Sequence, residues 1–264
     1  MKVTNSIPFK WLTGVILMIP LLLQSQIIIN TEKLCAYGNR GSFAGAELSF
    51  DIEKGNSDIL DVDGKSIICL DKNGHTTRLL LGLDYLEEDN HTLKMRHFIH
   101  LRHNYLFQKH FRTFAFYQIQ RNKSLLLKRR QLIGGGLRTM IGSPDSMKID
   151  LGTGLMVEKE ELNADKIEAG KEATSFTWRM ANVMTTVWRL KSSVSWINSI
   201  YLQPDIAHFR DYRLLEESSL LFSLNDFLAV TLSFVWRHDS RPPVHLKKND
   251  FNLVTGVVIH SKRH

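Results

Sequence analysis

The amino-acid sequence predicts an all-β fold, an antiparallel up-and-down transmembrane β-barrel of about twelve strands. Three observations support this fold. Apolar and polar residues alternate with period two in one segment after another, the connectors between the segments are short and polar, and the only long apolar run lies at the N-terminus. Most segments have about ten residues, which is the length that a tilted strand needs to cross a bilayer.

The N-terminus is expected to be a signal peptide over residues 1–25, followed by one barrel domain over residues 26–264. Lys2 and Lys10 precede the apolar run WLTGVILMIPLLL, Trp11 to Leu23, which is shorter than the roughly 20 apolar residues of a transmembrane helix. Polar residues follow the run, and we place the cleavage near Ser25. An uncleaved membrane anchor is the alternative. Because no second long apolar run follows, a helical membrane protein is not expected.

Composition excludes several classes of protein. The chain has 264 residues and a formal net charge of +7, which falls to +5 when Lys2 and Lys10 are removed. This excess is modest, and a nucleic-acid binder would concentrate its charge in a patch, so no nucleic-acid partner is expected. The two cysteines, Cys35 and Cys69, allow at most one disulfide bridge. Neither lies in a CxxC or CxxH pattern, so a structural zinc site is not expected.

The alternation is clearest in MKIDLGTGLMVE, Met147 to Glu158, where apolar residues occupy nearly every second position. Connectors such as GNSD, EEDN, QRNKS, GSPDS and LND separate the alternating segments. The stretch from Glu158 to Ala173 is charged and has no apolar face, so we expect it to be an exposed loop. The same alternation covers residues 44–53, 75–85, 93–108, 186–202, 228–237 and 251–259.

A closed barrel is favoured because closure removes the strand edges that would otherwise aggregate. In a membrane barrel the apolar residues face lipid and the polar residues face the lumen. A soluble β-sandwich would also alternate, so the periodicity favours the membrane barrel but leaves the soluble fold open. Aromatic residues near the segment ends are typical of interfacial girdles: Tyr85, Tyr105, Trp188, Trp196, Tyr201 and Trp236.

The histidine-rich stretch MRHFIHLRHNYLF, Met95 to Phe107, would suit a metal site if it were helical, because His97, His100 and His103 are spaced by three. On a strand, His97 and His103 face one side and His100 faces the other. The alternation favours the strand, so the three histidines are not expected to converge. Ile99 and Leu101 then face lipid, and a water-filled lumen is lined by Arg96, His100 and Arg102.

Two other motifs invite a chemical interpretation. His238, Asp239 and Ser240 are adjacent, but neighbouring residues alternate sides in an extended chain, so Asp239 cannot orient His238 as it would in a hydrolase. The prolines that follow favour a stiff turn. The glycines from Gly134 to Gly136 lack the ending of a phosphate loop and lie in a strand pattern, where they permit curvature, a bulge or a bulky lumen side chain opposite. The sequence therefore assigns no catalytic, cofactor-binding or metal-ligating residue.

The polar face carries both signs of charge. We expect these charges to pair across a narrow lumen, because buried charges must pair and about twelve strands enclose less space than the roughly 16–18 strands of open porins. The charged residues assigned to this face are Glu47, Asp51, Arg78, Asp84, Arg96, Arg102, Arg112, Lys148, Asp150, Arg179, Arg189 and Lys191.

Several stretches in order along the chain resemble one family: NTEKL, FAGAELSFDIEKGNSD, RHNYLF, FAFYQIQRNKSLLLKRRQLIGGGLR, LGTGLMVEKE, SIYLQPDIAHFRDYRLL and FVWRHDSRPPVHLKKNDFNLVTGV. On these stretches the chain resembles the domain-of-unknown-function 481 family, some members of which are described as salt-stress-induced outer membrane proteins. The resemblance covers nearly all of residues 30–259. It implies a bacterial outer-membrane β-barrel and implies no activity. Outer-membrane barrels commonly end in an aromatic residue that the assembly machinery recognises, and this chain instead has Ile259 and ends in His264.

The expected function is that of a structural envelope protein or narrow pore, with no catalysis and no cofactor. Its expected partners are the lipid bilayer and the outer-membrane assembly machinery, after export by the N-terminal signal. The alternatives are a lipid-acting outer-membrane enzyme and a soluble periplasmic β-protein that binds a ligand.

Overall fold

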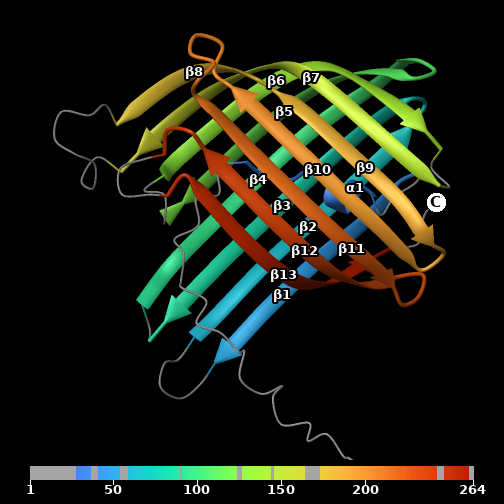
Figure 1. The fold of residues 1–264 in the computed structure, drawn as a ribbon, viewed down its shortest axis with the longest axis horizontal. Coiled ribbons are helices and arrows are strands. Elements are labelled where there is room, and N and C mark those ends of the chain that lie inside the picture. The colour runs from blue at the N-terminus through green and yellow to red at the C-terminus, as the bar shows by residue number, and fades with distance from the viewer. Residues whose placement is uncertain are drawn as a thin grey trace, which may run out of the picture.

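A single antiparallel sheet closes on itself in the computed structural model, which describes residues 28–36, 41–53, 59–89, 91–123, 127–143, 146–163, 173–242 and 247–261. Neighbouring strands along the chain pair with each other, except that β8 and β9 both pair with β7. The first strand, β1, also pairs with the last, β13, so the ring has no gap (Figure 1). The predicted signal peptide, residues 1–25, lies outside the described residues. Among the described residues, no helix is long and apolar enough to cross a membrane. The elements are α1 (Lys33–Ala36), β1 (Phe43–Glu53), β2 (Ile59–Lys72), β3 (His75–Glu88), β4 (His91–Gln108), β5 (Phe111–Asn122), β6 (Leu127–Gly142), β7 (Met147–Leu162), β8 (Thr174–Met180), β9 (Asn182–Lys191), β10 (Val194–Pro204), β11 (Tyr212–Ser223), β12 (Leu228–Asp239) and β13 (Asn249–His260).

The strands β8 and β9 behave as one strand of the barrel. Both pair with β7 in the same register, from Glu161↔Thr174 to Met147↔Trp188. The ladder is interrupted at Ala181, although its N–H still donates to the carbonyl of Gly154 at 2.8 Å. With β8 and β9 counted together, the described barrel has twelve strands, as the alternation predicts.

The two ends of the barrel differ in their connections. At the end where β1 begins and β13 ends, here the terminal end, the strands are joined by turns of two to four residues. Asn73 and Gly74 form one of these turns with φ of 51° and 79°, the left-handed backbone that a two-residue hairpin requires. The opposite end, here the loop end, carries the longer connections, including residues 163–173.

Two expected boundaries are wrong. Residues 186–202 form a hairpin rather than one strand, because β9 and β10 meet at a turn of residues 192–193. The register of β9 on β10 shifts by one residue between Val194 and Ser195, so Trp196 pairs with Trp188 and the alternation stays in phase across the turn, which hides the turn from a period-two pattern. The expected loop from Glu158 onward begins later, since β7 continues to Leu162 and the carboxylates of Glu158 and Glu160 contact basic side chains of other strands. Glu158 and Glu160 face the inside of the barrel, where those basic partners make a polar strand possible.

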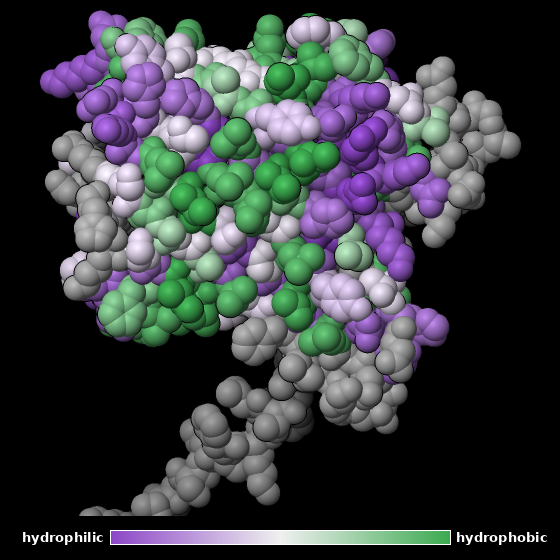
Figure 2. Space-filling view, turned by 180° about the vertical axis from the view of Figure 1, so that it is seen from behind, coloured by the Kyte–Doolittle hydropathy of each residue, from purple (hydrophilic) through white to green (hydrophobic). Residues whose placement is uncertain are grey.

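The outward face of the barrel is apolar, as predicted. Figure 2 shows hydrophobic side chains gathered in a belt across the middle of one face, with hydrophilic side chains toward the two ends. The exposed residues of β3 and β4 include Leu81, Leu83, Ile99 and Leu101, each more than 40% exposed. A soluble sandwich would bury such side chains in a core, so this pattern fits a barrel whose outer face contacts an apolar medium such as lipid.

Glycines allow close packing within the wall. A Cβ on Gly134 would lie 2.7 Å from the ring of Phe116, so this glycine leaves room for a lumen aromatic, as predicted. A Cβ on Gly136 would lie 2.1 Å from the carbonyl oxygen of Thr153, so here β6 and β7 approach too closely for a side chain. The register of β6 on β7 is unbroken across these glycines, so they form no bulge.

Candidate functional site: the filled lumen

Polar and charged side chains line the lumen from all around the barrel. These side chains are buried, although the backbone of the barrel encloses a wide space. Other groups of the protein therefore fill the space between them. Buried polar groups need hydrogen-bond or ionic partners, so the lumen is where the chain concentrates its specific interactions. The buried charged residues of the strands include Glu47, Asp84, Arg96, Arg102, Arg130, Arg138, Asp150, Glu158, Arg179, Arg213, Glu217, Arg237, Asp239 and Asp250.

Residues 28–36, here the lumen segment, lie inside the ring of strands and include α1 (Figure 1). The Oδ1 of Asn30 accepts hydrogen bonds from the backbone N–H groups of Glu32 and Lys33 at 2.9 and 3.2 Å, which caps this short helix. The N–H of Thr31 donates to the hydroxyl of Tyr201 at 2.9 Å. Tyr201 therefore faces the lumen, and its expected place in an aromatic girdle is wrong.

Lys33 binds the lumen segment to one wall of the barrel. Its Nζ lies 2.6 Å from Oε1 of Glu47 on β1 and 3.3 Å from Oε1 of Glu217 on β11. It also donates to the hydroxyl of Ser233 on β12 at 2.8 Å. Asn30 adds a hydrogen bond to Glu217 at 3.1 Å. One ammonium thus joins three strands that lie on the same side of the barrel.

Glu32 binds the opposite wall at a group of four arginines, here the arginine cluster: Arg78, Arg102, Arg112 and Arg138, from β3, β4, β5 and β6. It contacts three of them. Its carboxylate forms an ion pair with Arg102, lies 2.8 Å from Nη1 of Arg138 and lies 3.5 Å from Nη1 of Arg78. Arg112 and Arg138 share the carboxylate of Asp150 on β7 at 2.7 and 2.9 Å. The water-filled lumen expected around Arg102 is therefore wrong, because a carboxylate of the chain itself occupies it.

The electrostatics of Glu32 follow from this position. Burial alone would raise the pKa of its carboxyl, but the guanidiniums of Arg102, Arg138 and Arg78 outweigh burial and hold the pKa well below its usual range. Glu32 is therefore ionised at neutral pH, and the lumen segment carries a negative and a positive charge on adjacent residues, each facing its own wall.

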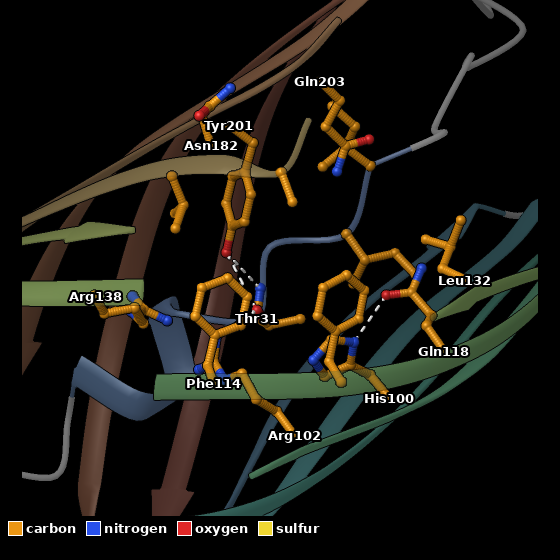
Figure 3. Close-up of a pocket in the computed structure, with 15 residues that line it drawn as sticks. Thr31, His100, Arg102, Phe114, Gln118, Leu132, Arg138, Asn182, Tyr201 and Gln203 are labelled. Carbon is orange, nitrogen blue, oxygen red and sulfur yellow. Dashed lines mark hydrogen bonds between the residues drawn. The ribbon is translucent and has the colours of Figure 1, made fainter. Parts of the chain in front are cut away.

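A cavity of about 60 Å³ remains beside the lumen segment (Figure 3). Ile29, Phe114 and Leu132 form part of its apolar lining, and Arg102, Arg138 and His100 part of its polar lining. The Nδ1 of His100 lies 2.9 Å from Oε1 of Gln118, whose amide nitrogen donates to Gln120 at 2.8 Å. This arrangement fixes His100 as the donor at Nδ1 and leaves its Nε2 facing no hydrogen-bond partner among the described residues.

A second ionic network lies nearer the loop end. Glu158 on β7 pairs with Arg130 on β6 and accepts hydrogen bonds from Arg213 on β11 at 2.7 Å. Arg179 on β8 lies 3.6 Å from the same carboxylate and 3.0 Å from Asp211. The network joins strands across the barrel, so the lumen is narrowed by ion pairs at this level as well, as predicted for a small barrel.

The histidines of β4 do not converge, as predicted. His100 is buried in the lumen, whereas His103 lies on the outer face with its Nε2 3.2 Å from Nδ1 of His75 and its Nδ1 2.9 Å from the hydroxyl of Thr77. Arg96 and Arg102 face the lumen, also as predicted. The thiol of Cys69 is free and buried, so it forms no disulfide.

The adjacent His238, Asp239 and Ser240 do not form a catalytic arrangement in the described chain. Nδ1 of His238 lies 2.9 Å from Oδ1 of Asn249 on the outer face, and Asp239 faces Arg213 at 3.5 Å in the lumen. Ser240 donates its backbone N–H to Tyr212 and accepts the N–H of Tyr212 at its hydroxyl. The opposite orientations of His238 and Asp239 are those predicted for an extended chain.

The lumen segment is the part of this site that the sequence interpretation missed. One signal for it is the imbalance of the predicted polar face, on which eight basic residues stand against four acidic ones. Such an excess inside a barrel requires carboxylates from elsewhere. The structure supplies them from Glu32, seven residues after the expected signal, and from Glu158, in the stretch interpreted as a loop.

Comparisons with known proteins agree with the fold. A family model described as "Protein of unknown function, DUF481" matches residues 46–260. No curated protein matches the chain. The translocator domain of the autotransporter NalP from Neisseria meningitidis is similar with a TM-score of 0.51 and 12% identity, over 85% of this chain and 89% of that one. The NanC porin has a TM-score of 0.49 and 6% identity, over 84% of this chain and 100% of that one. At such identities the likeness to NalP shows the fold alone, that of a bacterial outer-membrane barrel.

Proposed function

Because the chain belongs to the family described as protein of unknown function, DUF481, and has the fold of bacterial outer-membrane barrels, we propose that it spans the outer membrane as a narrow, non-catalytic pore that its own lumen segment closes. The observation that carries the proposal is the seating of Glu32 and Lys33 between opposite walls of the barrel. A purely structural barrel could pack its lumen with wall side chains alone. A segment that lies inside the ring and is not one of its strands is a part that can leave.

The outer surface supports the membrane location. Exposed apolar side chains form the belt of Figure 2. Elsewhere around the barrel, aromatic residues near the strand ends, such as Trp178, Trp188 and Trp236, also point outward. Trp178 and Trp188 are 52% and 46% exposed. Aromatic rings at both edges of an apolar belt are typical of the bilayer interfaces.

Planar-bilayer conductance tests the proposal with the full chain. The double variant Glu32→Ala/Lys33→Ala removes the ion pairs that Glu32 and Lys33 make with the walls, and it should open far more often than the wild type. Glu161→Gln is the matched control, since it removes an ion pair at 2.6 Å to Arg129 that lies outside the lumen. Heat-modifiable gel mobility verifies that each variant is folded.

Equal conductance of the wild type and the double variant would refute closure by the lumen segment. Absence of conductance from both folded proteins would leave a structural envelope barrel. Turnover of phospholipid by the purified protein would favour the lipid-acting enzyme instead.

A further inference from the structure

The arginine cluster contains two pairs of like charges that face each other directly. Arg78 is the cross-strand partner of Arg102, and Arg112 is the cross-strand partner of Arg138. Like charges opposite each other destabilise a sheet unless an anion lies between them. Lys148, two residues before Asp150 on the same face of β7, adds another positive charge nearby. The wall of the barrel is thus built around an anion.

The carboxylates of this cluster come from two sources. Asp150 on β7 belongs to the wall, and it reaches Arg112 and Arg138. The anion between Arg78, Arg102 and Arg138 is Glu32, which comes from the lumen segment and not from the wall. Glu32 therefore occupies the position of a ligand, attached to the protein by its own chain.

Two arginines of the cluster also have donor groups that Glu32 does not use. Arg102 and Arg138 both line the cavity of about 60 Å³. Nε and Nη2 of Arg102 and Nη2 of Arg138 are buried, and within the described residues they have no hydrogen-bond partner. The guanidinium fork matches the two oxygens of a carboxylate, and Phe114 lies beneath Arg138 with its ring centroid 6.0 Å from Cζ. Charged donors beside an apolar wall suit a small organic anion.

We propose that the arginine cluster is a binding site for small carboxylate anions, with Glu32 as its built-in occupant in the closed barrel. We then expect small carboxylate anions to be the class of solute that the pore favours when the lumen segment leaves the barrel. Only this second step rests on the proposed function. Binding at the cluster stands on the geometry of the cluster alone.

Chemical rescue tests the binding site without any need for conductance. Glu32→Ala removes the two carbons and two oxygens that acetate can replace. The midpoint of heat-modifiable unfolding should fall in this variant and should recover by several degrees with acetate. Neither acetamide, the neutral analogue, nor sodium chloride at equal ionic strength should restore it. Lys33→Ala is the matched control, because it weakens the same segment by removing a cation, and acetate should not rescue it.

An equal rise with acetate in the wild type, Glu32→Ala and Lys33→Ala would overturn the site, and so would the absence of any rescue of Glu32→Ala. If Glu32→Ala does not fold, its refolding yield with and without acetate gives the same comparison. An acetate-dependent yield supports the site, and an acetate-independent failure to fold refutes it.

The solute class is tested in the Glu32→Ala/Lys33→Ala variant by its reversal potential across a potassium acetate gradient. Acetate should permeate in preference to potassium. Adding Arg102→Gln and Arg138→Gln should remove most of this preference. A conducting barrel without anion preference would refute the solute assignment and leave the pore in place. A folded barrel that does not conduct would refute the pore, while the rescue by acetate still decides the binding site.

Discussion

A cation placed on the outer face of β4 should destabilise the barrel according to its depth. Ile99 is the ninth residue of the 18 in β4, is 48% exposed, and has Leu81 and Ile119 as its cross-strand neighbours. It therefore lies near the middle of the apolar belt. Replacing it with arginine should cost about 2–4 kcal/mol of unfolding free energy, the penalty for a cation at the midplane of the bilayer.

Leu93 on the same strand provides the internal control. It also faces outward, at 38% exposure, and lies six residues nearer the loop end. Six residues span about 20 Å of strand, or about 15 Å of depth at a tilt of about 40°. Since the apolar band is about 25 Å tall, Leu93 lies beyond its edge, and Leu93→Arg should cost only about 0–1 kcal/mol.

Equilibrium unfolding in denaturant of protein inserted in lipid vesicles, followed by tryptophan fluorescence, measures both costs. A cost at Leu93 equal to that at Ile99 would refute the depth assignment. Full refolding of the wild type in buffer without lipid or detergent would refute the membrane barrel as a whole.

Three further perturbations test the interior. Because the pKa of Glu32 is held low in the folded protein, its contribution to stability is complete above the ordinary carboxyl pKa and is lost only as pH falls through the lower folded pKa. The conductance of the closed barrel should therefore not change between about pH 8 and pH 5. Opening within that range would contradict the ion-pair geometry. Gly136→Ala should abolish or severely reduce folding yield into vesicles, whereas Gly64→Ala, whose Cβ would meet one side-chain carbon at 3.4 Å, should fold normally. Lys33→Ala should lower the free energy of unfolding by about 3–5 kcal/mol, because it leaves buried carboxylates uncompensated. Adding Glu47→Gln should recover part of that loss in the same unfolding assay. Strictly additive losses in the double variant would refute the coupling of the two residues.

The outer face of the barrel could be predicted because its alternation is a local property. In β12 each outward residue from Leu228 to Trp236 is apolar, and the lumen positions between them include Thr231 and Ser233. Lipid accepts any apolar side chain, so the pattern needs no knowledge of which strands are neighbours. The two-residue turn between β9 and β10 was not predicted because the register shift between Val194 and Ser195 keeps that pattern in phase across it.

The interior could be predicted only as a set of charges to be paired. Which carboxylate meets Arg102 depends on a segment more than 60 residues away, and Lys33 reaches a serine 200 positions along the chain. Residues 28–36 have no strand periodicity, and their position is set by partners on seven different strands rather than by their own pattern. Tyr201 shows the same limit, since an aromatic near a strand end suits a girdle until a backbone N–H inside the barrel is found bonded to its hydroxyl.

The attachment of the lumen segment to both walls also bears on the order in which the barrel can assemble. Its wall partners extend from Glu47 on β1 to Ser233 on β12, so the segment precedes all of them in the chain. Contacts of such long sequence separation form late, because the intervening chain must first be brought together. The segment therefore cannot complete its contacts until β12 is in place, one strand before the ring closes between β1 and β13. Closure of the ring and closure of the lumen then become a single late event, and the barrel has little opportunity to exist as a sealed wall around an open channel while it is still being built.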